Sequence, residues 1–166
     1  NFTELIDWKD HENDDIKHYS GTAIYKKTFS IDKSVLQEGR KLALDLGEVS
    51  IAAKVILNGE DLGVAWIAPY EVDITEAAKA GDNELIIELT NLWTNRLLGD
   101  NALPDNSGYD TKAKRMPEWY INNEPAPKSE RHTFTVTNFY RRESTKFLIS
   151  SGLLGPVKIK STKMVF

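Results

Sequence analysis

The residues of this sequence whose types could do chemistry are mainly aromatic, and their chemistry is that of binding. Trp66 and Tyr70 lie in a connection between two apolar stretches, whereas Trp119 and Tyr120 are adjacent in a longer connection. Arg115 is close in sequence to this second pair. Flat rings in loops can stack against a ligand, and a guanidinium group beside them can donate hydrogen bonds to it. We therefore consider these five residues candidates for a binding surface, with packing inside the protein an equal alternative for the first pair.

Catalytic groups are not recognisable by their spacing. The sequence contains 25 acidic residues, so a pair of carboxylates taken without order is no evidence of acid–base chemistry. The histidines, His11, His18 and His132, match no metal-binding spacing, and cysteine is absent. The sequence also contains no Gly-x-Ser-x-Gly nucleophile motif and no glycine-rich phosphate loop. We predict neither catalytic residues nor metal ligands.

Length and charge limit the class of protein. The 166 residues are enough for one domain with a sizeable core, whereas two domains would be cramped. The formal net charge of -4 provides no basic field that would attract nucleic acid or an anionic membrane. No apolar run approaches the roughly 20 residues of a membrane-spanning helix. We therefore expect a single domain over residues 1–166, with neither nucleic acid nor a membrane as its partner.

The apolar pattern has the period of β-strands. Leu42, Leu44 and Leu46 alternate with smaller or polar residues, as in a half-buried strand. Asn58-Gly59 separates two apolar runs and fits a hairpin turn, because both residues tolerate positive φ. Further strands are expected at 23–31, 53–57, 60–64, 70–74, 85–89, 133–137 and 157–160, with a helical turn at 75–80 and a turn at 153–156. Many short strands indicate an all-β sandwich or barrel.

The stretch 101–131 differs from the rest of the sequence. It contains four prolines and many polar residues, and a loop of this length is uncommon inside a compact domain. It is either a functional excursion or a partly disordered one. Trp119 and Tyr120 lie within it, and an unstructured linker would not need them.

Several segments, taken in order, resemble one known type of domain. Residues 19–29 resemble the opening strand of the sugar-binding domain of family 2-type glycoside hydrolases, and residues 44–49 resemble its second signature. Residues 55–63 resemble its V-x-x-N-G-x-x-x-G hairpin. Two later pieces, 91–100 and 151–157, resemble the C-terminal sandwich domain of bacterial enzymes related to family 106 α-L-rhamnosidases. The resemblance covers about residues 5–160 and is weakest over the 101–131 loop.

This resemblance implies a galactose-binding-like fold, a jelly-roll β-sandwich of two antiparallel sheets. Asn58 and Gly59 would form its hairpin, and Trp93, Arg96 and Asp100 would be architectural. Trp93 directly follows a buried-looking strand, so we expect it to pack at the end of the sandwich, as we expect Trp8 to pack the start of the chain. Arg96 and Asp100 are four residues apart and could pair on a helical turn.

The resemblance also implies a function. The chain would be a non-catalytic ancillary domain of a secreted bacterial glycoside hydrolase, periplasmic or extracellular. Its partners would be a carbohydrate, either a plant-type or a host glycan, or the catalytic domain of the same parent chain. The aromatic candidates and Arg115 then become carbohydrate-binding candidates. Two alternatives stay open, an autonomous lectin-like module and a purely structural interaction domain.

Two further features follow from the family. Asn123-Glu124-Pro125 resembles the acid/base segment of some barrel glycosidases, but it lies in a proline-rich loop of a chain too short for that barrel. Galactose-binding-like sandwiches often hold a structural calcium ion. Asp14, Asp15 and the acidic residues of 100–110 could contribute to one, although their spacing does not single them out.

Overall fold

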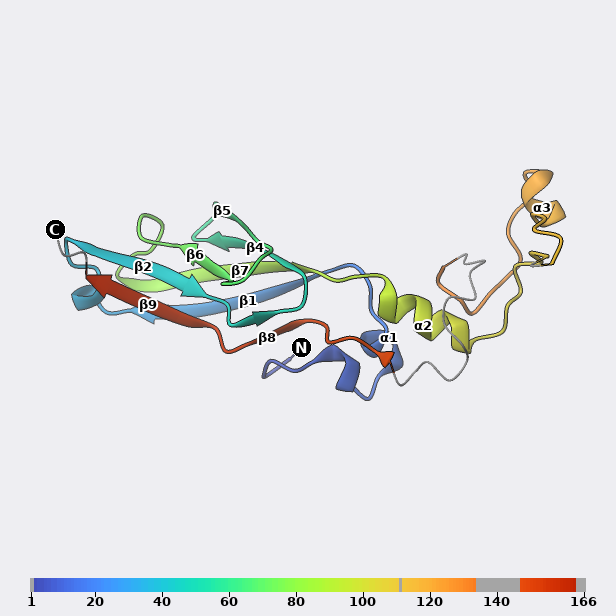
Figure 1. Ribbon diagram of the computed structural model, residues 1–166. Helices are drawn as coiled ribbons and strands as arrows, with labels where there is room; N and C mark the ends of the chain where they lie inside the picture. Colours follow the sequence, from blue (N-terminus) through green and yellow to red (C-terminus); the bar gives the residue numbers. More distant parts are fainter. Residues whose placement is uncertain (1, 111, 134–146, 164–166) are drawn as a thin grey trace.

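The fold is a sandwich of antiparallel sheets (Figure 1), seen in a computed structural model that describes residues 2–110, 112–133 and 147–163. One sheet has the strand order β1-β7-β4-β5, with bounds Thr22–Ile31, Gly81–Thr90, Ala52–Leu57 and Glu60–Ala65. The other has the order β6-β2-β9, with bounds Glu71–Asp73, Arg40–Asp45 and Lys158–Lys163. A short ladder joins β3 (Glu48–Val49) to β8 (Leu153–Gly155). The prediction of an all-β sandwich is confirmed.

The core lies between the two sheets because the central strands alternate. Leu44 of β2, Val55 of β4 and Ile87 of β7 are all buried, and the residues on either side of each in its strand are more exposed. Successive side chains of a strand point to opposite faces, so each period-two pattern in the sequence delivers one apolar face. Burial of these faces is the main contribution to the stability of the sandwich.

Of three local expectations, one is confirmed, one differs from the structure and one lies outside the described residues. The helical turn expected at 75–80 is present as a single turn, closed by a hydrogen bond of 2.9 Å from the Ala78 amide to the Ile74 carbonyl, which has the four-residue spacing of an α-helix. The expected turn at 153–156 is partly strand β8, because β3 supplies a pairing partner that the sequence pattern did not reveal. The strand expected at 133–137 lies outside the described residues after Thr133.

The β4–β5 hairpin turns at Asn58 and Gly59, whose φ values are 53° and 87°. The side-chain amide of Asn58 donates to the Ala77 carbonyl and to Asn83 Oδ1, both at 2.8 Å. Asn83 is fully buried and donates in turn to the carbonyls of Lys79 and Gly81. Buried polar groups need such partners, and here they connect the hairpin to the start of β7.

The start of the chain is fixed to its end. It contains the 3-10 helix η1 (Trp8–Asp10) and the short helix α1 (Asp14–Lys17), while η2 (Lys33–Val35) follows β1. Trp8 is 3% exposed, and its ring stacks on Tyr25 at a centroid distance of 6.4 Å, which confirms the expected packing. Its amide donates to the Ser151 carbonyl at 3.0 Å, and the Ser151 amide donates to Asp7 Oδ1 at 3.0 Å.

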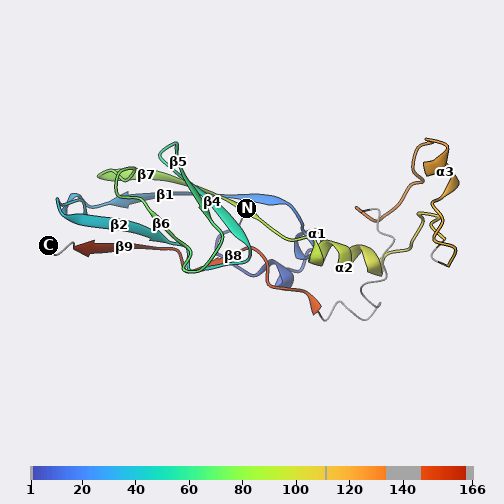
Figure 2. The ribbon, with the colours of Figure 1, turned by 45° about the horizontal axis from the view of Figure 1, so that its top comes forward.

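After β7 the chain leaves the sandwich through α2 (Thr94–Ala102) and continues as a segment that contains α3 (Glu118–Ile121). We call residues 103–133 the arm. Figures 1 and 2 both show α2 beyond the end of the sheets and α3 farther out still. None of the helices in the described part of the chain is long and apolar enough to cross a membrane.

Candidate functional site

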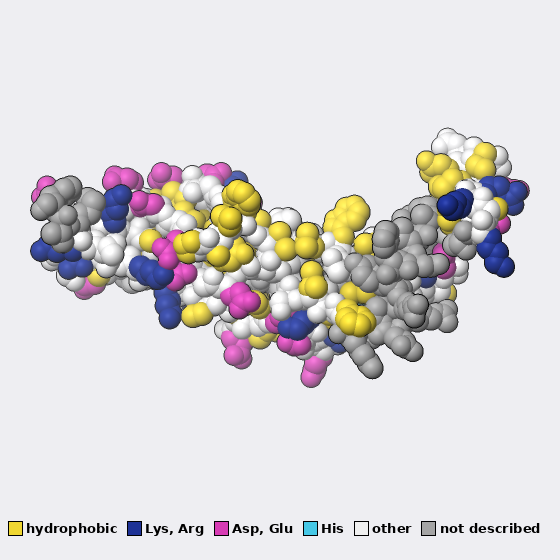
Figure 3. Space-filling view, viewed as in Figure 1, with side chains coloured by type: hydrophobic (Ala, Val, Ile, Leu, Met, Phe, Trp, Pro, Cys, Tyr) yellow, Lys and Arg dark blue, Asp and Glu magenta, His cyan; other side chains and the backbone are white. Residues whose placement is uncertain are grey.

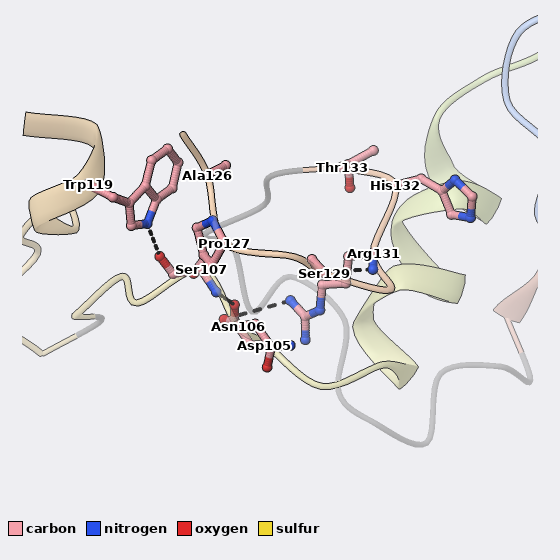
Figure 4. Close-up of a pocket in the computed structure, with 10 residues that line it drawn as sticks. All are labelled: Asp105, Asn106, Ser107, Trp119, Ala126, Pro127, Ser129, Arg131, His132 and Thr133. Atoms are coloured by element: carbon pink, nitrogen blue, oxygen red, sulfur yellow. Dashed lines mark hydrogen bonds and ion pairs between the residues drawn. The ribbon is translucent and has the colours of Figure 1, made fainter. Parts of the chain in front are cut away.

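The arm folds back on itself and encloses a cleft of about 290 Å³ (Figure 4). One wall comes from the outgoing stretch, a second from α3 and a third from the returning stretch. The lining residues are Asp105, Asn106, Ser107, Trp119, Ala126, Pro127, Ser129, Arg131, His132 and Thr133. Figure 4 shows that His132 points away from the others, toward α2.

Trp119 supplies the aromatic wall of the cleft. Pro117 precedes α3 with φ of -65°, which suits the entry to a helix. The indole Nε1 of Trp119 donates to the Ser107 carbonyl at 2.8 Å, so the ring is held in place across the cleft. Figure 4 shows Ala126 and Pro127 beside the indole. The half-buried ring is thus oriented by its polar atom, and its carbon surface is left to line the cleft.

Arg131 and Asp105 supply charge opposite the aromatic wall. The Nε and Nη2 atoms of Arg131 donate to the Leu103 carbonyl at 3.1 and 2.7 Å, and Nη1 lies 3.7 Å from Asp105 Oδ2. Burial raises the pKa of Asp105, but hydrogen bonds from Ser107 and the charge of Arg131 outweigh it and hold that pKa below its usual value. The carboxylate is therefore ionised at neutral pH.

Asp100 attaches the returning stretch of the arm to α2. Its fully buried carboxylate accepts hydrogen bonds from the amides of His132 (3.2 Å) and Thr133 (2.7 Å) and from the Thr133 hydroxyl. Arg96 Nε lies 3.2 Å from Asp100 Oδ1 in an ion pair, although its N–H makes no hydrogen bond with the described residues. The pair that the four-residue spacing predicted therefore forms, and both residues lie on α2. No sequence pattern predicted the bonds from His132 and Thr133.

Gly99 allows α2 to pack closely on the start of the chain. A Cβ atom at this position would lie 2.6 Å from Cγ of His18 and 2.8 Å from Nη2 of Arg96. A larger residue would therefore displace either α1 or the ion pair. The base of the arm depends on this contact, because α2 carries both Arg96 and Asp100.

The structure separates the predicted binding residues into two groups. Trp119 lines the cleft, and Tyr120 makes an edge contact with it at 5.9 Å but is exposed and outside the lining. Arg115 is exposed on the arm and is also outside the lining. Trp66 follows β5 and is 69% exposed, whereas Tyr70 packs against the sandwich core. A single surface shared by Trp66 and Trp119 is therefore not formed in the described chain.

Trp93 does not pack at the end of the sandwich as expected; it is 70% exposed at the start of α2. Its neighbours Asn91 and Asn95 turn inward instead. The side-chain amide of Asn91 donates to the Tyr19 carbonyl at 3.2 Å, and the Asn95 side chain forms two hydrogen bonds with the backbone of Ile149, at 2.8 and 3.0 Å. Asn95 thus both donates to and accepts from the backbone of one residue, whereas an indole can only donate.

The polar members of the cleft were missed from the sequence. Asp105 caps the amide of Ser107 at 3.0 Å, a local turn that an Asp-x-Ser pattern favours. That signal predicts a turn and contains no information about Arg131, which arrives from the other end of the arm.

Exposed Glu124 lies outside the cleft lining. Within residues 2–110, 112–133 and 147–163, no group of three or more His, Asp or Glu side chains could hold a metal ion, so the calcium candidates are not brought together there.

Comparison with known families shows which family the chain belongs to. A family model described as glycosyl hydrolase 2 galactose-binding domain-like matches residues 7–133. The chain belongs to this family. The match includes the sandwich strands β1 to β7, α2 and all of the arm.

Two relatives extend the comparison. The chain is 48% identical over 159 residues to a Formosa agariphila protein named "Putative beta-glucuronidase", covering 95% of this chain and 13% of that protein. It also matches a solved rhamnosidase structure from Novosphingobium sp. PP1Y with a TM-score of 0.75 and 32% identity, over 97% of this chain and 13% of that one. The galactose-binding-like family resemblance is thereby confirmed, and the chain spans about an eighth of the length of both relatives.

Proposed function

We propose that this chain is a non-catalytic ancillary domain of a secreted glycoside hydrolase, periplasmic or extracellular, and that it binds carbohydrate in the cleft of the arm. The observation that carries the proposal is the placement of the Trp119 ring across from Asp105 and Arg131. A sugar ring has a C–H face that packs on an aromatic surface, while its hydroxyl groups take donors and acceptors at its edge. The cleft combines both kinds of group on one segment.

The relatives support the wider part of the proposal. The names of both describe glycosidases, and this chain matches about an eighth of each. Hydrolysis needs two carboxylates across one glycosidic bond, and a domain of this size would leave that work to the remainder of the protein. The purified chain should release no product from rhamnosides or glucuronides, and turnover by the chain alone would contradict this.

Titration of intrinsic tryptophan fluorescence tests the sugar site. Rhamnose, galactose and pectin-derived oligosaccharides are added to the chain, and saturation is expected with a Kd on the order of 1 mM or lower, equivalent to about -4 kcal/mol. Trp119→Ala should weaken binding about tenfold. Trp93→Ala is the matched control, because it removes an exposed tryptophan outside the cleft. Equal affinities for the two variants would refute a site at Trp119.

A second function, bracing the catalytic domain, is favoured by the outer end of the arm. Tyr120 and Ile121 of α3 are 59% and 63% exposed, and Figure 3 shows hydrophobic side chains at that end of the molecule. Exposed apolar side chains grouped on a projecting segment are typical of an interdomain contact. A folded chain that binds none of the sugars, together with release of the domain from its parent enzyme by Tyr120→Asp, would favour bracing over binding.

A further inference from the structure

The cleft of the arm has room for a single sugar ring. Its volume of about 290 Å³ lies at the lower end of the range of small-molecule sites, roughly 300–1,000 Å³. Trp119 forms one side, and Figure 4 shows Asp105 and Arg131 on another side, away from the indole. A ring that packs on the indole therefore turns an edge toward this charged pair, and a second ring of the same glycan would extend into solvent.

The charged pair leaves room for a hydroxyl group. Asp105 Oδ1 accepts a hydrogen bond from the Ser107 amide at 3.0 Å, whereas Oδ2 faces Arg131 Nη1 at 3.7 Å. This second separation is longer than a direct hydrogen bond, which is roughly 2.7–3.2 Å. A hydroxyl group is both donor and acceptor, so one placed at this point can accept from Nη1 and donate to Oδ2.

Arg131 is not arranged as a receptor for an anion. Its Nε and Nη2 atoms both donate to the Leu103 carbonyl, at 3.1 and 2.7 Å. Two parallel N–H groups of this kind are the usual binding site for a carboxylate, and here they are already in use. The remaining nitrogen, Nη1, is the one that faces Asp105.

The rest of the lining offers an anion no second cation. Of the described residues that line the cleft, Arg131 alone has a permanent positive charge, and His132 points away toward α2. The other polar side chains of the lining are uncharged, namely Asn106, Ser107, Ser129 and Thr133. A carboxylate that entered the cleft would therefore find its one counterion already paired.

We infer that the cleft selects an uncharged sugar residue and that Asp105 excludes uronates, an inference that rests on the sugar site of the proposed function. Burial raises the pKa of Asp105, but hydrogen bonds from Ser107 and the charge of Arg131 outweigh this effect, so the carboxylate is ionised at neutral pH. Because only one ring fits, the carboxylate of a uronate stays within a Debye length of Asp105, roughly 8–10 Å, and the two repel. The hydroxyl groups of a neutral sugar match both members of the pair instead.

Three sugars that differ only at C6 test the inference. Galactose, galacturonate and the methyl ester of galacturonate are each titrated into the chain at neutral pH, and tryptophan fluorescence is measured. Galacturonate alone is charged, and the ester controls for the size of the C6 group. We expect galactose and the ester to bind about tenfold more tightly than galacturonate, equivalent to about 1.4 kcal/mol.

Asp105→Asn identifies the group responsible for the selection. It removes the charge but keeps a side-chain oxygen for the Ser107 amide, so the affinities for galactose and galacturonate should come within about twofold of each other. Glu124→Gln is the matched control, because it removes an exposed carboxylate of the arm outside the cleft lining, and it should keep the full preference for galactose. The sugar comparison in the unchanged protein does not depend on the folding of either variant.

Failure of the inference can be distinguished from failure of the proposed function. If none of the three sugars gives saturation, or if Trp119→Ala leaves their affinities unchanged, the sugar site itself is wrong and the inference falls with it. If binding depends on Trp119 but galacturonate binds as tightly as galactose, the inference alone is overturned. It is also overturned if the ester binds as weakly as galacturonate, since size would then decide, or if the preference for galactose persists in Asp105→Asn.

Discussion

Replacement of Asp100 by alanine should destabilise the protein more than any other change at the base of the arm. The substitution removes the acceptor for the amides of His132 and Thr133, and it leaves the Arg96 side chain, 13% exposed, without its carboxylate. Hydrogen bonds to charged groups contribute about 1.5–3 kcal/mol each, and breaking a buried ion pair costs about 3–5 kcal/mol. The two effects overlap, so we expect a loss of about 3–5 kcal/mol in the free energy of unfolding.

Urea denaturation followed by circular dichroism measures this loss. With a slope of about 2 kcal/mol per molar urea, the midpoint of Asp100→Ala should fall by about 2 M. Asp105→Ala is the control, because that carboxylate is 41% exposed and lies 3.7 Å from Arg131; it should cost about 1 kcal/mol or less. Hydrogen exchange of the Thr133 amide should become much faster in the first variant alone.

The reasoning fails if Asp100→Ala and Asp105→Ala have the same midpoint. That result would mean that the returning stretch of the arm adds nothing to the stability of α2. Asp100→Asn separates charge from geometry, since it keeps one oxygen acceptor and loses the ion pair. It should lie between the wild-type protein and the alanine variant, and a stability equal to wild type would show that the Arg96 contact is neutral.

Three further changes test the sandwich. Burial raises the pKa of Asp7, but hydrogen bonds from Lys9 and Ser151 outweigh this effect and lower that pKa from 3.8. The stability that Asp7 contributes should therefore be present above about pH 4 and be lost as the pH falls through the lowered pKa. When urea midpoints are measured against pH, this part of the acid dependence should be absent from Asp7→Asn. Gly152→Ala places a Cβ atom 2.7 Å from the Trp8 ring and should lower the midpoint of thermal unfolding. Gly63→Ala is the control, because Gly63 has a similar φ but no neighbour within 4 Å, and its midpoint should stay well above that of Gly152→Ala. Equal midpoints would contradict the clash. Asn83→Ala should cost about 2–3 kcal/mol in urea, since it leaves buried partners unpaired, and a loss under about 0.5 kcal/mol would refute that.

The sequence was informative wherever neighbours in the chain decide the outcome. The alternation of Leu42, Leu44 and Leu46 directly predicted a strand with a buried face, and Asn58-Gly59 predicted the hairpin turn. Each of these patterns is local, because it depends on strand pleat or on allowed φ values.

The features that the sequence did not reveal depend on partners far along the chain. Asp100 could be expected to pair with Arg96, but its bonds to His132 and Thr133 require the arm to return. Trp93 was expected inside because it follows a buried strand, yet the inward turn at this point belongs to Asn95 and its bonds to Ile149. Asp105 and Arg131 likewise meet only after the arm has folded back.

The position of β9 has a consequence for the order of folding. β2 lies between β6 and β9, and its register pairs Leu44 with Ile159, while the Asp7 carboxylate meets the Ser151 amide 144 residues later. During synthesis, one side of β2 stays unpaired until β9, residues 158–163, has left the ribosome. Contacts so distant in sequence slow folding, because the long loop between them must close first. A nascent chain that stops before residue 158 should therefore remain protease-sensitive and dependent on chaperones, and completion of β9 should be the event that protects it.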